Sequence, residues 1–204
     1  MTIVLSGAVW AEEVTIAALG DSLTQGYGLP ADQGFVPQLQ TWLQGQGADV
    51  VLINAGVSGD TTAGGLSRIE WTLTDDVDAL IVALGGNDML RGLDPGAARE
   101  NLDGILSVAQ DQGVPVLLVG MDAPPNYGPE YEAAFDAMYP DLAAAYGVLY
   151  HANFLGALAA LEDRELALQT YMQPDRIHPN ADGVVLIVED LGPSVQRLVL
   201  QVEE

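Results

Sequence analysis

The chain contains 204 residues, of which 49% are hydrophobic and 6% aromatic. This length suits one domain with a sizeable core, and the composition excludes a disordered or fibrous protein. The 29 acidic residues far outnumber the six basic ones, all of them arginine, so the formal net charge is −23. Such a surface repels phosphate backbones and anionic lipid headgroups, and we therefore expect no nucleic-acid partner.

The start of the chain resembles the end of an export signal. Residues 1–11 are largely apolar and finish in Val9-Trp10-Ala11, directly before two acidic residues. A small residue at that point is typical of a signal-peptide cleavage site. We interpret residues 1–11 as a signal-peptide remnant or disordered leader. A signal peptide predicts a periplasmic or secreted protein; otherwise we expect a cytoplasmic one. Residues 12–204 are then a single domain, with no apolar run of membrane-spanning length and hence no stable membrane insertion.

Apolar runs and helical patterns alternate along the whole chain. The apolar runs are almost unbroken, as expected of strands that are buried on both faces, and they cover residues 14–19, 50–54, 80–84, 114–119 and 148–150. The helical patterns cover residues 35–43, 61–73, 95–112, 129–146 and 182–202. Asp60 is the expected N-cap of the second helix, and Pro95 after Asp94 marks the start of the third. This order predicts an α/β fold with a parallel sheet and helices on both faces.

In such a fold, functional groups gather beyond the carboxyl ends of the strands. Ser22 stands there, in the sequence Gly20-Asp21-Ser22-Leu23 after the first predicted strand. A serine hydroxyl becomes a nucleophile when a base takes its proton. At a strand end its own N–H group can also face the developing oxyanion. Taken alone, however, the four residues fit a serine in a turn or helix cap better.

A base is offered by the loop Asp175-Arg176-Ile177-His178-Pro179. Histidine is the usual general base because its pKa is near working pH. An acid three residues earlier can reach Nδ1, fix the tautomer and leave Nε2 facing the serine. A surface loop with a chance acid is the alternative explanation. The other histidine, His151, lacks such a neighbour, and we interpret it as structural.

Two further strand ends offer hydrogen-bond donors for an oxyanion. Gly59 can present its N–H group, because a residue without a Cβ lets a substrate approach closely. Asn87, in Gly85-Gly86-Asn87-Asp88, can present its side-chain amide. One such donor typically contributes about 3–4 kcal/mol to transition-state stabilisation. Either site alone is better explained as a turn.

Together these blocks resemble the SGNH (GDSL-type) hydrolases, named for a Ser, a Gly, an Asn and a His in four separate blocks. The segments GDSLTQGYGL, NAGVSGDTTAGGL, LGGNDMLRG, APPNYG and DRIHPN are similar to the bacterial thioesterase I/protease I/lysophospholipase L1 and arylesterase branch. The resemblance implies a three-layer α/β/α sandwich with a five-stranded parallel sheet (flavodoxin-like). It implies Ser22 as nucleophile, His178 as base, Asp175 as its orienting acid, and Ser22, Gly59 and Asn87 as oxyanion donors. Met89 and Leu90 fall where that branch has a loop that lines the acyl site, although core packing would explain them equally well.

The resemblance predicts hydrolysis of carboxylic esters through an acyl-serine, with a small-molecule ester as partner and neither a metal nor an organic cofactor. Residues Gly26 to Ala31 match the glycine pattern of dinucleotide-binding sites, but the match begins too far after its strand to indicate cofactor binding. Asp75, Asp76 and Asp78 could bind a cation, but three acids in a polar loop are usually just solvated. The acidic chain favours neutral short to medium acyl or aryl esters. Other possibilities stay open: thioesters and lysophospholipids as substrates, a carbohydrate acetylesterase, and a non-catalytic binder. The oligomeric state is open as well.

Overall fold

The computed structural model describes residues 13–203 and contains a five-stranded, fully parallel sheet. The strands lie in the order β2-β1-β3-β4-β5 and are β1 (Val14–Gly20), β2 (Val50–Gly56), β3 (Ala79–Ala83), β4 (Val116–Val119) and β5 (Leu149–His151). This is the flavodoxin-like order, in which the chain reverses direction across the sheet between β1 and β3. The predicted leader at residues 1–11 lies outside the described residues.

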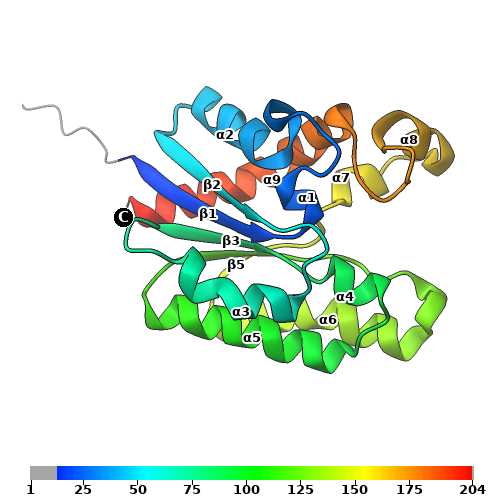
Figure 1. Cartoon of the computed structure of the whole chain (residues 1–204), viewed down its shortest axis with the longest axis horizontal. Helices are drawn as coiled ribbons and strands as arrows, with labels where there is room; N and C mark the ends of the chain where they lie inside the picture. Colours follow the sequence, from blue (N-terminus) through cyan, green and yellow to red (C-terminus); the bar gives the residue numbers. More distant parts are fainter. Residues whose placement is uncertain (1–12, 204) are drawn as a thin grey trace, which may run out of the picture.

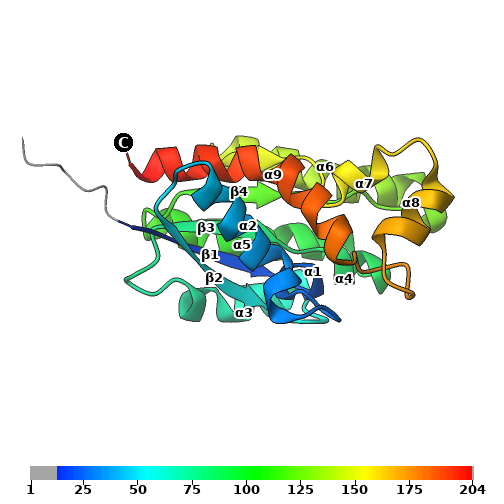
Figure 2. The ribbon, with the colours of Figure 1, turned by 90° about the horizontal axis from the view of Figure 1, so that it is seen from above.

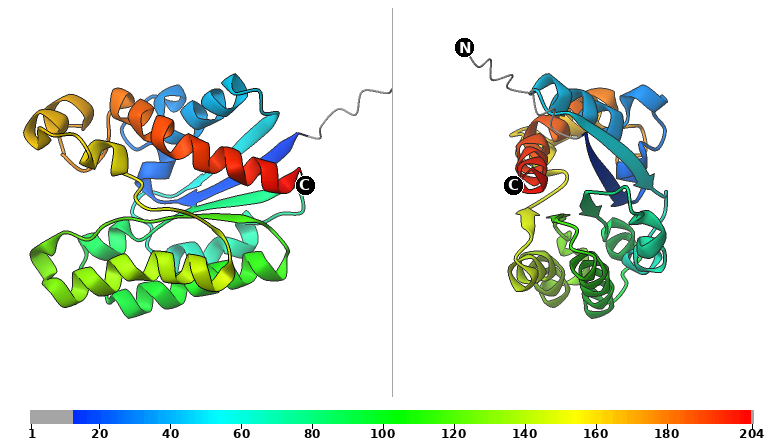
Figure 3. Two further views of the ribbon diagram at one scale, coloured as in Figure 1. Left: turned by 180° about the vertical axis from the view of Figure 1, so that it is seen from behind. Right: turned by 90° about the vertical axis from the view of Figure 1, so that its left-hand side faces the viewer.

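Helices cover both faces of the sheet and form the outer layers of a three-layer sandwich (Figure 1). The long helices on one face are α2 (Phe35–Gly45) and α9 (Ala181–Val202), and those on the other face are α3 (Thr62–Thr72), α5 (Pro95–Asp111) and α6 (Pro129–Tyr146). Each face buries its own apolar cluster, the first around Phe35, Leu39 and Leu191, the second around Leu102, Phe135 and Tyr139. The layers are also separate when the molecule is seen from its side (Figure 3). The predicted fold class is therefore confirmed.

The strand and helix boundaries follow the apolar patterns closely, with one cap assigned wrongly. Asp60 was the expected N-cap of α3, but the cap is Thr61, whose side chain accepts a hydrogen bond from the N–H of Gly64. Asp60 instead pairs with Arg68 over 2.7 Å. Arg68 also donates to the carbonyl oxygens of Ala55 and Gly20 at 2.7 and 2.9 Å. The acid therefore orients an arginine that joins α3 to the carboxyl ends of β1 and β2.

Short elements gather at the carboxyl end of the sheet, the right-hand end in Figure 1 and Figure 2. They are the helices α1 (Ser22–Gln25), α4 (Gly86–Leu90), α7 (Gly156–Ala159) and α8 (Arg164–Tyr171), with 3-10 turns at η1 (Ala31–Gln33) and η2 (Pro125–Tyr127). The sequence patterns did not predict these elements, because four to eight residues are too few to show a helical period. Among residues 13–203, no helix combines the length and apolarity needed to cross a bilayer.

Candidate active site

Three predicted residues from the two ends of the domain meet in one hydrogen-bonded line. Ser22 is the first residue of α1, directly after β1, whereas Asp175 and His178 lie in the loop between α8 and α9. The Oγ atom of Ser22 lies 2.8 Å from Nε2 of His178, and Nδ1 of His178 lies 2.7 Å from Oδ2 of Asp175. These distances are within hydrogen-bond reach for a nucleophile, a base and an acid that orients the base.

The tautomer of His178 follows from its partners. An ionised carboxylate only accepts hydrogen bonds, so Nδ1 carries the proton that Asp175 binds, and Nε2 is left as the acceptor for the Ser22 hydroxyl. Burial raises the pKa of Asp175, but hydrogen bonds from the His178 side chain and from the N–H groups of Ile177 and His178 outweigh it and lower this pKa to about 2. Asp175 is therefore ionised at and well below neutral pH.

The loop that carries the base is tightly tied to the rest of the site. Oδ1 of Asp175 accepts hydrogen bonds from the N–H groups of Ile177 and His178, each at 3.0 Å. Gln173 donates from Nε2 to the carbonyl oxygen of Pro179 at 2.9 Å and to that of Tyr27 at 2.7 Å. The Tyr27 ring in turn lies 4.7 Å from the imidazole of His178, centroid to centroid. Gln173 thus links the base loop to the segment that follows the nucleophile, a role that no local sequence pattern signals.

The predicted donor Gly59 lies just beyond β2, at the edge of the sheet that also carries Ser22. Its φ angle is +81°, in the left-handed region that favours glycine. Its carbonyl oxygen accepts a 2.7 Å hydrogen bond from Nη2 of Arg91, at the end of α4. The loop after β2 is therefore held to the loop after β3, and Gly59 itself is exposed.

Asn87 lies in the first turn of α4, where Gly85 has a φ angle of +120°. A side chain at Gly85 would collide with the hydroxyl of Tyr139, which donates to the carbonyl oxygen of Leu84 at 3.0 Å. Nδ2 of Asn87 lies 3.1 Å from Oδ2 of Asp21, the residue before the nucleophile. The predicted donor therefore lies beside the Ser22 segment.

The two residues predicted to contact the substrate have different surroundings. Met89 is half-buried and packs against the apolar cluster under α5 and α6. Leu90 is 54% exposed, and its carbonyl oxygen accepts a 3.3 Å hydrogen bond from the hydroxyl of Tyr127. Met89 therefore packs partly against the core, whereas Leu90 is exposed at the surface.

The second histidine takes part in a different cluster. Nδ1 of His151 lies 3.3 Å from Oγ of Ser194, and Nε2 lies 3.5 Å from a carboxylate oxygen of Asp190. Arg197 also donates to the Ser194 hydroxyl, at 3.0 Å. Ser194 is only 5% exposed and lies within α9, so a substrate carbonyl cannot approach it. The cluster joins β5 to α9, and the structural interpretation of His151 is supported.

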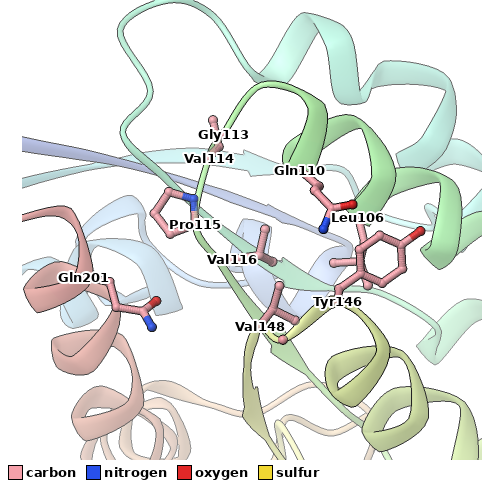
Figure 4. Close-up of a pocket in the computed structure, with 10 residues that line it drawn as sticks. Leu106, Gln110, Gly113, Val114, Pro115, Val116, Tyr146, Val148 and Gln201 are labelled. Carbon is pink, nitrogen blue, oxygen red and sulfur yellow. The ribbon is translucent and has the colours of Figure 1, made fainter.

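A cavity of about 510 Å³ opens at the opposite, amino end of the sheet (Figure 4). It lies between the ends of α5, α6 and α9 and is lined mainly by apolar and amide side chains, among them Leu106, Gln110, Val116, Tyr146, Val148 and Gln201. None of the predicted site residues lines it. No group of three or more His, Asp or Glu side chains within residues 13–203 is arranged to hold a metal ion.

Comparison with known proteins agrees with the fold. The sequence profile of the GDSL-like lipase/acylhydrolase family matches residues 18–185. The chain is 38% identical to the esterase TesA of Pseudomonas aeruginosa over 91% of this chain and 89% of that protein. It is 35% identical to thioesterase 1/protease 1/lysophospholipase L1 of Escherichia coli, over 91% and 85%. The crystal structure of AlinE4, an SGNH-hydrolase family esterase, superposes with a TM-score of 0.74 at 43% identity over 92% of this chain and 97% of that one.

A parallel sheet with a serine, a histidine and an acid aligned at its carboxyl edge defines a hydrolase of the serine type. The chain belongs to the GDSL-like lipase/acylhydrolase family, and its activity is the hydrolysis of esters.

Proposed function

We propose that the chain hydrolyses neutral carboxylic esters through an acyl-enzyme on Ser22. The observation that carries this proposal is the 2.8 Å contact between the Ser22 hydroxyl and the unprotonated nitrogen of His178. His178 removes the proton while Oγ attacks the carbonyl carbon, and the carbonyl oxygen becomes a tetrahedral oxyanion. The N–H groups of Ser22 and Gly59 and the amide of Asn87 bind this oxyanion.

Collapse of the intermediate breaks the ester bond. His178 returns its proton to the departing alcohol, and the acyl group stays on Ser22. His178 then deprotonates a water molecule, which attacks the acyl carbon. The second intermediate releases the carboxylic acid and restores the serine hydroxyl, so each cycle consumes one ester and one water and yields one acid and one alcohol. Asp175 remains ionised and stabilises the imidazolium form of His178.

Exposed apolar side chains flank the proposed oxyanion donors. Val57 precedes Gly59 by two residues and is 47% exposed, and Leu90 follows Asn87 by three and is 54% exposed. These exposed side chains offer an apolar surface beside the donors, on which an acyl or aryl group can bind. The net charge of −23 disfavours polyanionic substrates such as acyl-CoA. We therefore favour short to medium acyl or aryl esters.

Hydrolysis of p-nitrophenyl esters from acetate to palmitate tests the proposal, with Ser22→Ala measured in parallel. We expect turnover that peaks at a short or medium chain and is lost in the variant. A comparison of kcat/KM for an acyl-CoA and a neutral ester of equal chain length tests the substrate preference. A clear preference for the acyl-CoA would contradict the charge argument while leaving the nucleophile untouched.

A further inference from the structure

Asp21, the residue before the nucleophile, has surroundings that its cap position alone does not explain. Its side chain is only 3% exposed. Oδ1 accepts a 3.0 Å hydrogen bond from the N–H group of Leu23 and so caps α1. Oδ2 accepts the 3.1 Å hydrogen bond from Nδ2 of Asn87. The carboxylate forms no ion pair within residues 13–203.

A buried carboxylate without a cationic partner is costly. A serine or asparagine would cap a four-residue helix as well as an aspartate does, and without a buried charge. The cap therefore does not account for the carboxylate. Toward Asn87, the feature that only an ionised carboxylate provides is a second oxygen that accepts hydrogen bonds and never donates them.

This property decides which way the amide of Asn87 points. The oxygen and nitrogen ends of a carboxamide have nearly the same shape, so packing alone selects weakly between its two orientations. Facing Asp21, the amide must present its nitrogen, because an oxygen there would meet another acceptor. The NH₂ group has two hydrogens, and the second remains available to a substrate oxyanion. In the reversed orientation the amide oxygen would be presented to the reaction in place of the donor.

We propose that Asp21 is a positioning residue of the oxyanion hole, which holds the Asn87 amide in the donating orientation. Asp21 does not touch the reacting atoms and acts on the reaction only through Asn87. This inference rests on the proposed function, in which Asn87 binds the oxyanion. The buried negative charge near the oxyanion is the cost of the arrangement, and loss of the correct amide orientation outweighs relief from that charge.

A double-mutant cycle on hydrolysis of p-nitrophenyl butyrate tests the proposal, with Asp21→Asn, Asn87→Ala and the double variant. Loss of one oxyanion donor typically lowers kcat about 10²- to 10³-fold. We expect Asp21→Asn to lower kcat about 10- to 100-fold with little change in KM, because the new amide allows Asn87 to reverse. In the Asn87→Ala background, the same Asp21 substitution should change kcat less than about twofold.

Two further variants separate orientation from folding. Asp21→Ser keeps an acceptor for the Leu23 N–H group but offers none to Asn87, and we expect the same loss of kcat as in Asp21→Asn. Asp163→Asn is the matched control, because Asp163 caps α8 through the N–H group of Leu166 and is exposed. That control should retain wild-type kcat.

Three results would overturn the proposal. Unchanged kcat in Asp21→Asn or Asp21→Ser would show that Asn87 needs no acceptor, and increased kcat would show that charge repulsion dominates. An equal loss in the wild-type and Asn87→Ala backgrounds would show that Asp21 acts by another route. Failure of the proposed function itself would be separate, since it would appear as turnover that persists in Ser22→Ala.

Discussion

Arg91 donates a 2.7 Å hydrogen bond from Nη2 to the carbonyl oxygen of Gly59, across the two loops that carry the proposed oxyanion donors. The contact is solvent-exposed, but it is formed by one of only six basic residues in a chain with 29 acidic ones. It fixes the loop after β2 against the end of α4, so Gly59 and Asn87 are positioned together.

Removal of this contact should weaken catalysis more than stability. We expect Arg91→Ala to lower kcat about 3- to 10-fold, because a charge-assisted hydrogen bond to a backbone group contributes about 1.5–3 kcal/mol at most and is partly replaced by water at the surface. Arg99→Ala removes the same charge from α5, where Arg99 lies 3.8 Å from Asp141, and should leave kcat unchanged. Equal effects of the two substitutions would indicate a general charge effect.

A substitution at Gly59 tests whether the backbone conformation of the same loop matters for catalysis. A Cβ built at this position meets only Nη2 of Arg91, at 3.6 Å, so Gly59→Ala introduces no steric collision. The φ angle of +81° nevertheless costs a residue with a side chain about 1–2 kcal/mol. We expect the loop to shift its N–H group and kcat for p-nitrophenyl butyrate to fall about 10- to 100-fold. Gly47→Ala, with a φ angle of +92° at a remote turn, is the matched control and should lower stability without lowering kcat.

Gln173 tests the alignment of the base with the nucleophile. Gln173→Met removes the hydrogen bonds to Tyr27 and Pro179 while keeping the length of the side chain. We expect kcat to fall about tenfold, because small displacements of a reacting group cost up to about 10²-fold in rate. Gln169→Met is the control, since the Gln169 amide donates a 3.1 Å hydrogen bond to the exposed Glu165, away from the base and the nucleophile. Wild-type kcat in Gln173→Met would show that the loop is held without this residue.

Asp21 should also show its buried charge in the pH dependence of stability. Burial raises its pKa above the ordinary value of 3.8, against the lowering effects of the Leu23 N–H group, His178 and Asn87, while Asp60 raises it further. The ionised form therefore destabilises the folded state above this raised pKa. We expect Asp21→Asn to be at least as stable as the wild type at pH 7. The wild type should gain stability relative to the variant as the pH falls through the raised pKa towards 3.8.

Asp175 should behave in the opposite way. Its pKa is lowered from 3.8 to about 2 in the folded protein, so its ionised form stabilises the fold above pH 3.8 and loses this contribution as the pH falls towards 2. Urea unfolding of the wild type, Asp21→Asn and Asp175→Asn between pH 2 and 7 measures both effects. A stability difference between the wild type and Asp21→Asn that does not change with pH would contradict the buried-charge explanation.

Much of the fold could be predicted because each strand is an unbroken apolar run and each long helix has a regular pattern. The helix boundaries at Pro95 and at residues 129 and 146 followed from proline and glycine at their ends. The cap at Asp60 was wrong because Asp60 pairs with Arg68 instead of the helix end. Arg68 in turn donates to the carbonyl oxygen of Gly20, which is 48 residues away in the sequence. A contact between residues so far apart cannot be predicted from the local sequence.

The candidate site divides in the same way. Ser22, Asp175 and His178 could be found because their residue types and their order along the chain carry the chemistry. Asp21, Gln173 and Arg91 could not be assigned their contacts, because these depend on which loops meet at the carboxyl edge of the sheet. The cluster of Ser194, His151 and Asp190 shows the converse, since these residue types alone do not make an active site when the hydroxyl is buried in a helix.

The central claim is that Ser22 carries the acyl group, and mass spectrometry of the acid-quenched reaction with p-nitrophenyl acetate tests it most directly. The account predicts an added acetyl group on the peptide that contains Ser22, present in the wild type and in Ser194→Ala and absent from Ser22→Ala, which should also lose turnover. An acetyl group on another serine, or hydrolysis that persists in Ser22→Ala, would contradict it.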